Sequence, residues 1–71
     1  MKNNPLLAEA MNKITIELIN SLDYGEEIKL NKKYTLYHYC EDDIIVLKDT
    51  KNWEEIFQIL INDEEIIFEK L

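Results

Sequence analysis

One glycine and one proline stand in the 71 residues of this chain, and no stretch is rich enough in serine or glycine to act as a linker. Short elements joined by tight connections are therefore expected. At this length one domain forms, and it buries only about 60% of the surface of its unfolded chain. Because 46% of the residues are hydrophobic, a core can form despite an acidic composition. We expect a single domain spanning residues 1–71.

The first predicted element is a helix that starts at Pro5 and ends before Gly25. Asn4 can cap it, proline suits the first helical position, and glycine suits the left-handed residue after a helix. Apolar residues recur on one face at helical spacing, namely Leu7, Met11, Ile14, Leu18 and Leu22. Ile16 lies on the opposite side and Ile19 on a flank, which favours a helix that is covered on two sides or takes part in an interface.

Three strand-like segments follow the helix. Residues 26–30 alternate between apolar and polar, and residues 34–40 are rich in residues that favour strands. Residues 44–48 return after a polar break at residues 41–43. One face of the middle segment carries Thr35, Tyr37 and Tyr39. A meander of three antiparallel strands is the simplest arrangement.

The second predicted helix starts near Asn52, which can cap it while Glu55 reaches back at capping-box spacing. Its apolar stripe consists of Trp53, Ile56, Phe57 and Leu60. The helix should end at Asn62–Asp63, which are poor helix formers. Residues 64–71 can continue the helix or form a strand, and we favour a short strand. The predicted fold class is α+β, in the order α-β-β-β-α-β, with an antiparallel sheet, both helices on one face and the tyrosines on the other.

The charge is unevenly distributed along the chain. There are eight lysines, no arginine and 15 carboxylates, which give a net charge of −7. Residues 1–40 hold five carboxylates and five lysines, so the whole excess lies in residues 41–71. Carboxylates at turns and helix starts serve solubility and capping in any protein. Acidic clusters that converge on one surface also attract a basic partner and can occupy a groove made for phosphates.

The residues predicted to bind such a partner form three acidic clusters. They are Asp42, Asp43, Glu54, Glu55, Asp63, Glu64 and Glu65. Tyr37 and Tyr39 are candidate aromatic anchors, because tyrosine is favoured in protein interfaces. Lysines beside the aromatic residues of segment 32–39 also fit a platform for single-stranded nucleic acid. The negative charge and the missing arginines favour a protein partner over direct binding of nucleic acid.

His38 and Cys40 share one face of a predicted strand, but they supply only two metal ligands where zinc takes three or four from the protein. They also lack a third group that would orient a base and a nucleophile. A packed cysteine beside a half-buried histidine is the simpler interpretation. The sequence contains no calcium loop, phosphate-binding loop or zinc-protease motif. We expect no catalytic residue, no metal site and no cofactor.

The hydropathy pattern contains no apolar run suited to a signal peptide or to a membrane-spanning helix, which needs roughly 20 residues. One cysteine cannot form an internal disulfide, which fits a reducing cytoplasm. Lysine without arginine, together with abundant isoleucine and asparagine, is the bias that AT-rich codons produce. A cytoplasmic protein of a low-GC bacterium or of one of its phages is expected.

These observations predict a non-enzymatic, acidic protein-binding module. Its most concrete form is an inhibitor that docks on a basic surface of a nucleic-acid-handling protein, and in size and charge the chain resembles anti-CRISPR and other phage anti-defence proteins. One alternative is a homo-oligomeric structural or regulatory protein, such as a homodimer, in which Ile16, Ile19 or the tyrosine face builds a symmetric interface. Another is an immunity-type protein that neutralises a basic nuclease toxin.

Overall fold

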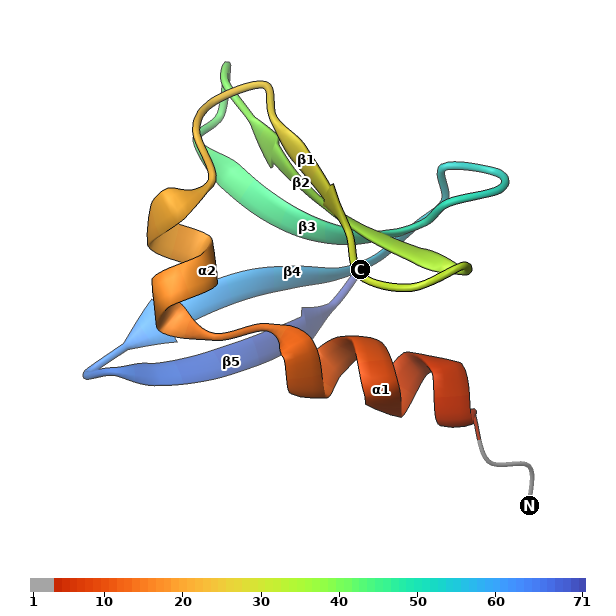
Figure 1. Ribbon diagram of the computed structural model, residues 1–71. Coiled ribbons are helices and arrows are strands. Elements are labelled where there is room, and N and C mark those ends of the chain that lie inside the picture. The colour runs from red at the N-terminus through yellow and green to blue at the C-terminus, as the bar shows by residue number, and fades with distance from the viewer. Residues whose placement is uncertain (1–3) are drawn as a thin grey trace.

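The computed structural model describes residues 4–71, so the first three residues of the expected domain lie outside it. Two helices precede five strands (Figure 1). The elements are α1 (Pro5–Lys13), α2 (Ile16–Ser21), β1 (Glu27–Lys29), β2 (Tyr34–Tyr39), β3 (Ile44–Asp49), β4 (Glu55–Asn62) and β5 (Glu65–Lys70). The strands form an antiparallel meander in the order β1-β2-β3-β4-β5. The α+β class is confirmed, but the order of elements is not the predicted α-β-β-β-α-β.

The predicted N-terminal helix is divided into α1 and α2. Asn4 caps α1 as expected, because its Oδ1 accepts a hydrogen bond from the Leu7 N–H at 3.1 Å. Thr15 then starts a second helix, since its backbone is extended and its Oγ1 accepts from the Leu18 N–H at 3.0 Å. Three β-branched residues in succession, at 14–16, also have low helix propensity. The break turns the chain so that Ile19, predicted on a flank, is buried.

Residues 55–62 form the strand β4 where the sequence analysis predicted a helix. The segment is rich in isoleucine and phenylalanine, which favour strands. Pairing with both β3 and β5 satisfies its backbone on two sides and buries Ile59 in the core. The apolar positions of so short a run fit a helical and a strand period almost equally, so the neighbouring strands decide the outcome. The tail forms β5, which confirms the preferred strand.

The residues expected to cap a helix build the β3–β4 turn instead. Asn52 Oδ1 accepts a hydrogen bond from the Glu54 N–H at 2.9 Å, and Trp53 has a φ of 61°. Asp49 Oδ1 accepts from the Lys51 N–H at 2.9 Å. Asparagine and aspartate make such local bonds as readily in turns as at helix starts. Asn52 therefore does bond to a nearby backbone N–H as a cap would, but it does so in a turn and not at the start of a helix.

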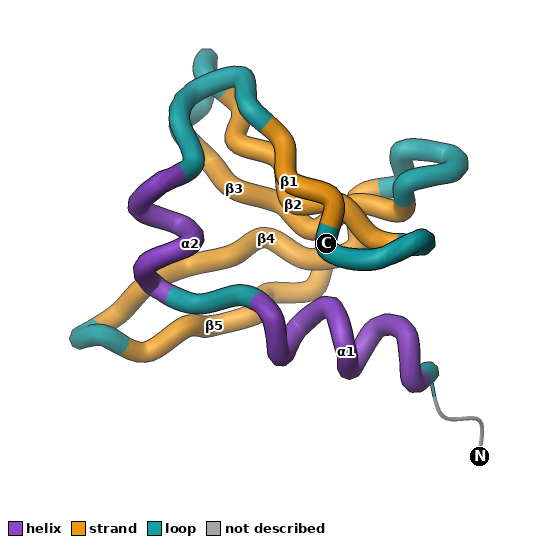
Figure 2. Tube along the Cα trace, viewed as in Figure 1, coloured by secondary structure: helices purple, strands orange, loops and turns teal. Residues whose placement is uncertain are grey.

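The core lies between the two helices and one face of the sheet (Figure 2). Its buried members are Ala10, Ile14, Ile19, Leu22, Leu30, Tyr34, Leu36, Leu47 and Ile59. The strand alternation predicted for β2 is confirmed, since Leu36 faces this core while Thr35 and Tyr37 lie on the other face. Within residues 4–71, no helix is long and apolar enough to cross a membrane.

Candidate functional site

The acidic end of the molecule collects carboxylates from three segments that are distant in the sequence. Alternate turns of an antiparallel meander lie at the same end of the sheet, so the β2–β3 and β4–β5 turns share an end. The connection from α2 to β1 reaches the same end, because the Gly25 N–H donates to the His38 carbonyl at 2.7 Å. We define the acidic end as Asp23, Glu26, Glu41, Asp42, Asp43, Asp63, Glu64 and Glu65, all of which are exposed.

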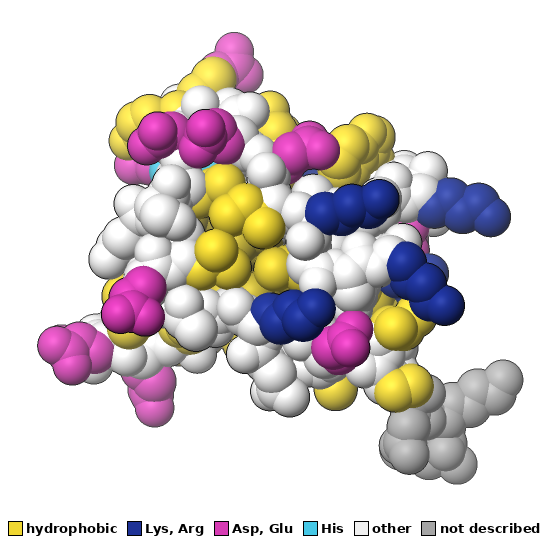
Figure 3. All heavy atoms as spheres, in the orientation of Figure 1, with side chains coloured by type: hydrophobic (Ala, Val, Ile, Leu, Met, Phe, Trp, Pro, Cys, Tyr) yellow, Lys and Arg dark blue, Asp and Glu magenta, His cyan; other side chains and the backbone are white. Residues whose placement is uncertain are grey.

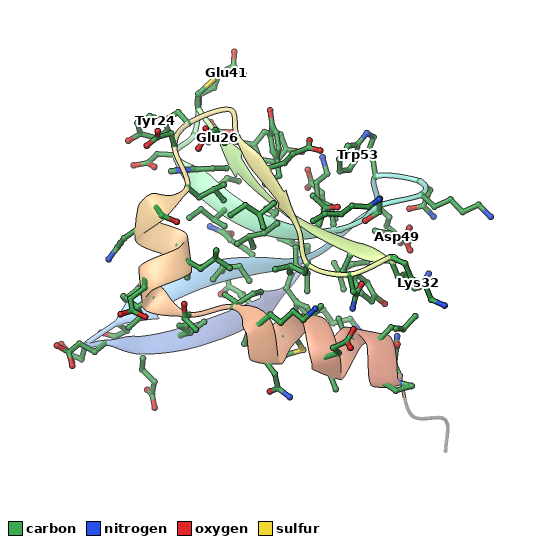
Figure 4. All side chains as sticks on the ribbon, viewed as in Figure 1. Tyr24, Glu26, Lys32, Glu41, Asp49 and Trp53 are labelled. Carbon is green, nitrogen blue, oxygen red and sulfur yellow. The ribbon has the colours of Figure 1, made fainter. Side chains whose placement is uncertain are left out.

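The opposite end of the sheet carries most of the lysines. It is formed by the β1–β2 and β3–β4 turns, and its members are Lys29, Lys32, Lys33, Lys48, Lys51 and Lys70. In Figure 3 most acidic side chains lie at the top and left and most lysines at the right, with some acidic side chains beside the lysines, and Figure 4 places Glu26 and Glu41 far from Lys32. The lysine end also holds Asp49, Glu54, Glu55 and Glu69, and Lys33 is paired there with Asp49 at 2.8 Å, so this end carries both signs of charge.

Two of the three predicted acidic clusters lie at the same end of the sheet, on the tips of two different hairpins, and the third lies at the other end. Glu54 and Glu55 lie beside the β3–β4 turn at the lysine end. Glu55 is further engaged there, since its Oε2 accepts a hydrogen bond from the Tyr39 hydroxyl at 2.5 Å. The sequence analysis missed Asp23, Glu26 and Glu41 as members of the acidic surface. Asp23 and Glu26 lie near the turn at 41–43 because β1 pairs with β2, which composition cannot indicate, whereas Glu41 belongs to that turn.

The two acidic turns are the tips of a fork. Pairing between β3 and β4 stops at Ile45 and Ile59, whereas the β4–β5 ladder continues to Asn62 and Glu65. The two hairpins therefore diverge toward the acidic end, with α2 beside the gap (Figure 1). A cavity of about 400 Å³ lies at the base of the fork. We call it the fork pocket.

The fork pocket has an apolar floor and a polar wall. The floor is formed by Ile19, Leu22, Ile45, Ile59, Leu60 and Ile61. The wall includes Asp23, Tyr24, His38 and Asp43. An apolar cavity with a few convergent polar groups is the usual form of a binding site for a small molecule or a side chain.

His38 is held by hydrogen bonds at both of its ring nitrogens. Its Nδ1 donates to the Leu22 carbonyl at 2.8 Å, and its Nε2 donates to Asp43 Oδ1 at 2.9 Å. Both partners are acceptors, so the imidazolium form satisfies both bonds. Burial lowers the pKa of His38, but the bonds to Asp43 and to the Leu22 carbonyl outweigh this effect, and the pKa is raised. The negative charge of Asp43 also raises the pKa of Tyr24.

This arrangement makes His38 a poor general base, because neither ring nitrogen faces a position that a substrate could occupy. Cys40 does not pack beside it as the sequence analysis expected. Cys40 lies in the β2–β3 turn and is exposed. Within residues 4–71, no group of three or more histidine, cysteine or acidic residues is placed to hold a metal ion.

The free energy of unfolding should fall as the pH rises above the ordinary pKa of histidine, about 6.5. The folded pKa of His38 is raised above its unfolded value. Its contribution is therefore fully present below the unfolded pKa and is lost as the pH rises through the folded pKa. Urea denaturation at several pH values measures this slope, and His38→Gln should flatten it. A variant with the wild-type slope would contradict the assignment to His38.

Tyr37 and Tyr39 lie on the outer face of the sheet, as predicted, but they surround a lysine of the same chain. The ammonium of Lys48 lies 5.2 Å, 4.9 Å and 4.7 Å from the ring centroids of Tyr37, Tyr39 and Trp53. Lys48 also donates to the Tyr39 hydroxyl at 2.6 Å. These cation–π contacts cover Val46, which is fully buried on this face. The two tyrosines thus hold Lys48 on this face, and their role as anchors for a partner stays a prediction.

Comparison of the chain with protein-family models, with curated proteins and with solved structures finds no match.

Proposed function

We propose that this protein is a non-enzymatic binding module that docks through its acidic end on a basic surface of another protein. The observation that supports the proposal is that exposed carboxylates of residues 23–26, 41–43 and 63–65 lie at the same end of the sheet, on two diverging hairpins and the connection before β1. These three segments contain no lysine. Within residues 4–71, the ion pair recorded at this end is that between Asp43 and His38. A concentrated negative potential accelerates encounter with a positive surface and rejects acidic competitors.

The partner that we propose is a nucleic-acid-handling protein. Such proteins present lysine and arginine in the grooves that receive phosphates. Exposed carboxylates at the tips of two hairpins offer oxygen anions to the same side chains, so the module would compete with nucleic acid for the groove. A phage-encoded inhibitor of a bacterial defence protein would act in this way. An immunity protein against a basic nuclease toxin would use the same electrostatics, and the identity of the captured partner separates the two.

The test is affinity capture from a low-GC bacterial lysate, followed by binding kinetics with the captured protein. Three forms of the module are compared: the wild type, Asp42→Asn/Glu65→Gln at the acidic end, and the control Glu54→Gln/Glu69→Gln, which removes the same number of charges away from it. We expect the association rate of the wild type to fall about tenfold or more between low and moderate salt. The acidic-end variant should associate more slowly by a similar factor, and duplex DNA should compete.

Equal effects of the acidic-end variant and the control would overturn the proposal, because the position of the charges would then be irrelevant. Binding that does not depend on salt would also overturn it. Sedimentation velocity of the protein alone completes the comparison. A salt-insensitive dimer that captures no partner would instead support the homo-oligomeric alternative.

A further inference from the structure

The fork pocket combines features that match one kind of occupant. Its floor is aliphatic, with Ile19, Ile45 and Ile59 behind and Ile61 at the mouth, where the Ile61 side chain is exposed. Its wall carries the carboxylates of Asp23 and Asp43, the ring of Tyr24 and the His38 ring, which is bonded to Asp43, so the two carboxylates outnumber the one cation. A cavity of about 400 Å³ has room for one long side chain and is small for a folded segment. An occupant that is apolar along its length and cationic at its tip would suit both the aliphatic floor and the acidic wall of the pocket.

From this geometry we infer that the fork pocket receives an arginine side chain of the basic partner, an inference that rests on the proposed function and specifies its anchor. The three methylenes of arginine would lie against the isoleucines of the floor, which removes apolar surface from water on both sides. The guanidinium would reach the carboxylate of Asp23 and the other oxygen of Asp43, whose Oδ1 already accepts from His38 Nε2 at 2.9 Å. Its planar face also suits the Tyr24 ring, which is 59% exposed and stands 4.6 Å from the His38 ring.

The position of the pocket explains why one anchor can act together with many surface charges. The acidic turns at 41–43 and 63–65 stand on either side of the pocket, because the β2–β3 and β4–β5 hairpins diverge from its base. Exposed carboxylates on the rim steer a basic surface toward the fork, and they are individually weak once bound. A desolvated side chain at the centre of an interface contributes more to the lifetime of a complex. The acidic turns therefore govern the association rate, and the fork pocket governs dissociation.

Butylguanidinium tests this inference without the unidentified partner, and its neutral isostere butylurea is the matched control. The two probes share the aliphatic stem and differ in charge. We expect butylguanidinium to shift the methyl resonances of Ile19, Ile45 and Ile61 with a dissociation constant on the order of 10 mM, as suits so small a ligand. Butylurea should bind at least about fivefold more weakly. Equal affinity for the two probes, or shifts confined to other methyl groups, would overturn the inference.

Two variants locate the binding on the protein. Asp23 is exposed, so Asp23→Asn should not disturb the fold. It should reduce the ratio of the affinities for butylguanidinium and butylurea toward one. Ile61→Trp, at a position that is 44% exposed, should fill the mouth of the pocket and abolish binding of both probes. Asp63→Asn/Glu65→Gln lies on the rim and should leave the preference within about twofold of wild type. If butylguanidinium fails to bind while the acidic-end variant still loses the captured partner, the inferred anchor is wrong and the proposed function stands.

Discussion

Leu36→Ala should lower the free energy of unfolding by about 3 kcal/mol, which is the cost of deleting a large buried side chain and leaving part of its volume empty. Leu36 has no exposed surface and lies at the centre of β2, opposite Leu47. A domain of 71 residues has a total stability on the order of 5 kcal/mol. The substitution should therefore leave about 2 kcal/mol, so that the unfolded population rises by about a hundredfold to a few per cent.

Urea denaturation followed by circular dichroism measures this effect as a lower midpoint with an unchanged slope. Leu71→Ala is the matched control, because the same side chain is 57% exposed at the end of the chain and follows β5. It should change the free energy of unfolding by no more than about 0.5 kcal/mol. Similar losses for the two variants would show that the core is not organised around β2 and β3.

The second large effect is a gain in stability at the β4–β5 turn. Asp63 and Glu64 have φ values of 52° and 67°, so both central residues of this two-residue turn adopt the left-handed conformation that a type I′ hairpin requires. Aspartate tolerates this conformation better than glutamate does, and asparagine followed by glycine tolerates it best. Asp63→Asn/Glu64→Gly should raise the free energy of unfolding by about 1 kcal/mol, which corresponds to about 5 °C in Tm.

Asp63→Ala/Glu64→Ala is the control. It removes the same two charges, but it leaves the strain of two non-glycine residues at positive φ. Alanine at two left-handed positions should lower the free energy of unfolding by about 1 kcal/mol. An equal gain from both double variants would mean that charge repulsion, and not the turn, limits stability. The more stable variant, Asp63→Asn/Glu64→Gly, also shows whether slower binding can occur without a loss of stability. It should still associate more slowly with the partner, because it has lost two carboxylates of the acidic end.

The elements that could be predicted from sequence are those whose signals are local. Asn4 and Pro5 mark the start of α1, since capping involves only the next few residues. The two faces of residues 34–39 mark β2, and the aliphatic run 44–47 after the polar break at 41–43 marks β3. The break at Thr15 was missed, since an apolar stripe at helical spacing continues across it and conceals the competing N-cap.

The segment 55–62 shows where local signals fail. Its capping residue and apolar spacing are compatible with a helix, and only the backbone partners supplied by β3 and β5 make the strand the better choice. Because residues 55–62 form a strand and not the predicted helix, Glu54 and Glu55 lie away from the other acidic residues. In an antiparallel meander each added strand places the next turn at the opposite end of the sheet. The presence of β4 therefore decided which acidic turns lie at the same end.

The amino-acid sequence alone therefore determined the fold class, the early strands, the segregation of tyrosines from the core on β2, and the excess of negative charge. Each of these follows from the residue types and their spacing over a few positions. Only the tertiary structure decided which carboxylates stand together, that lysines occupy the other end, and that two hairpins diverge to form a pocket. These features depend on strand number and on where a ladder stops, which are set by contacts between residues far apart in the chain.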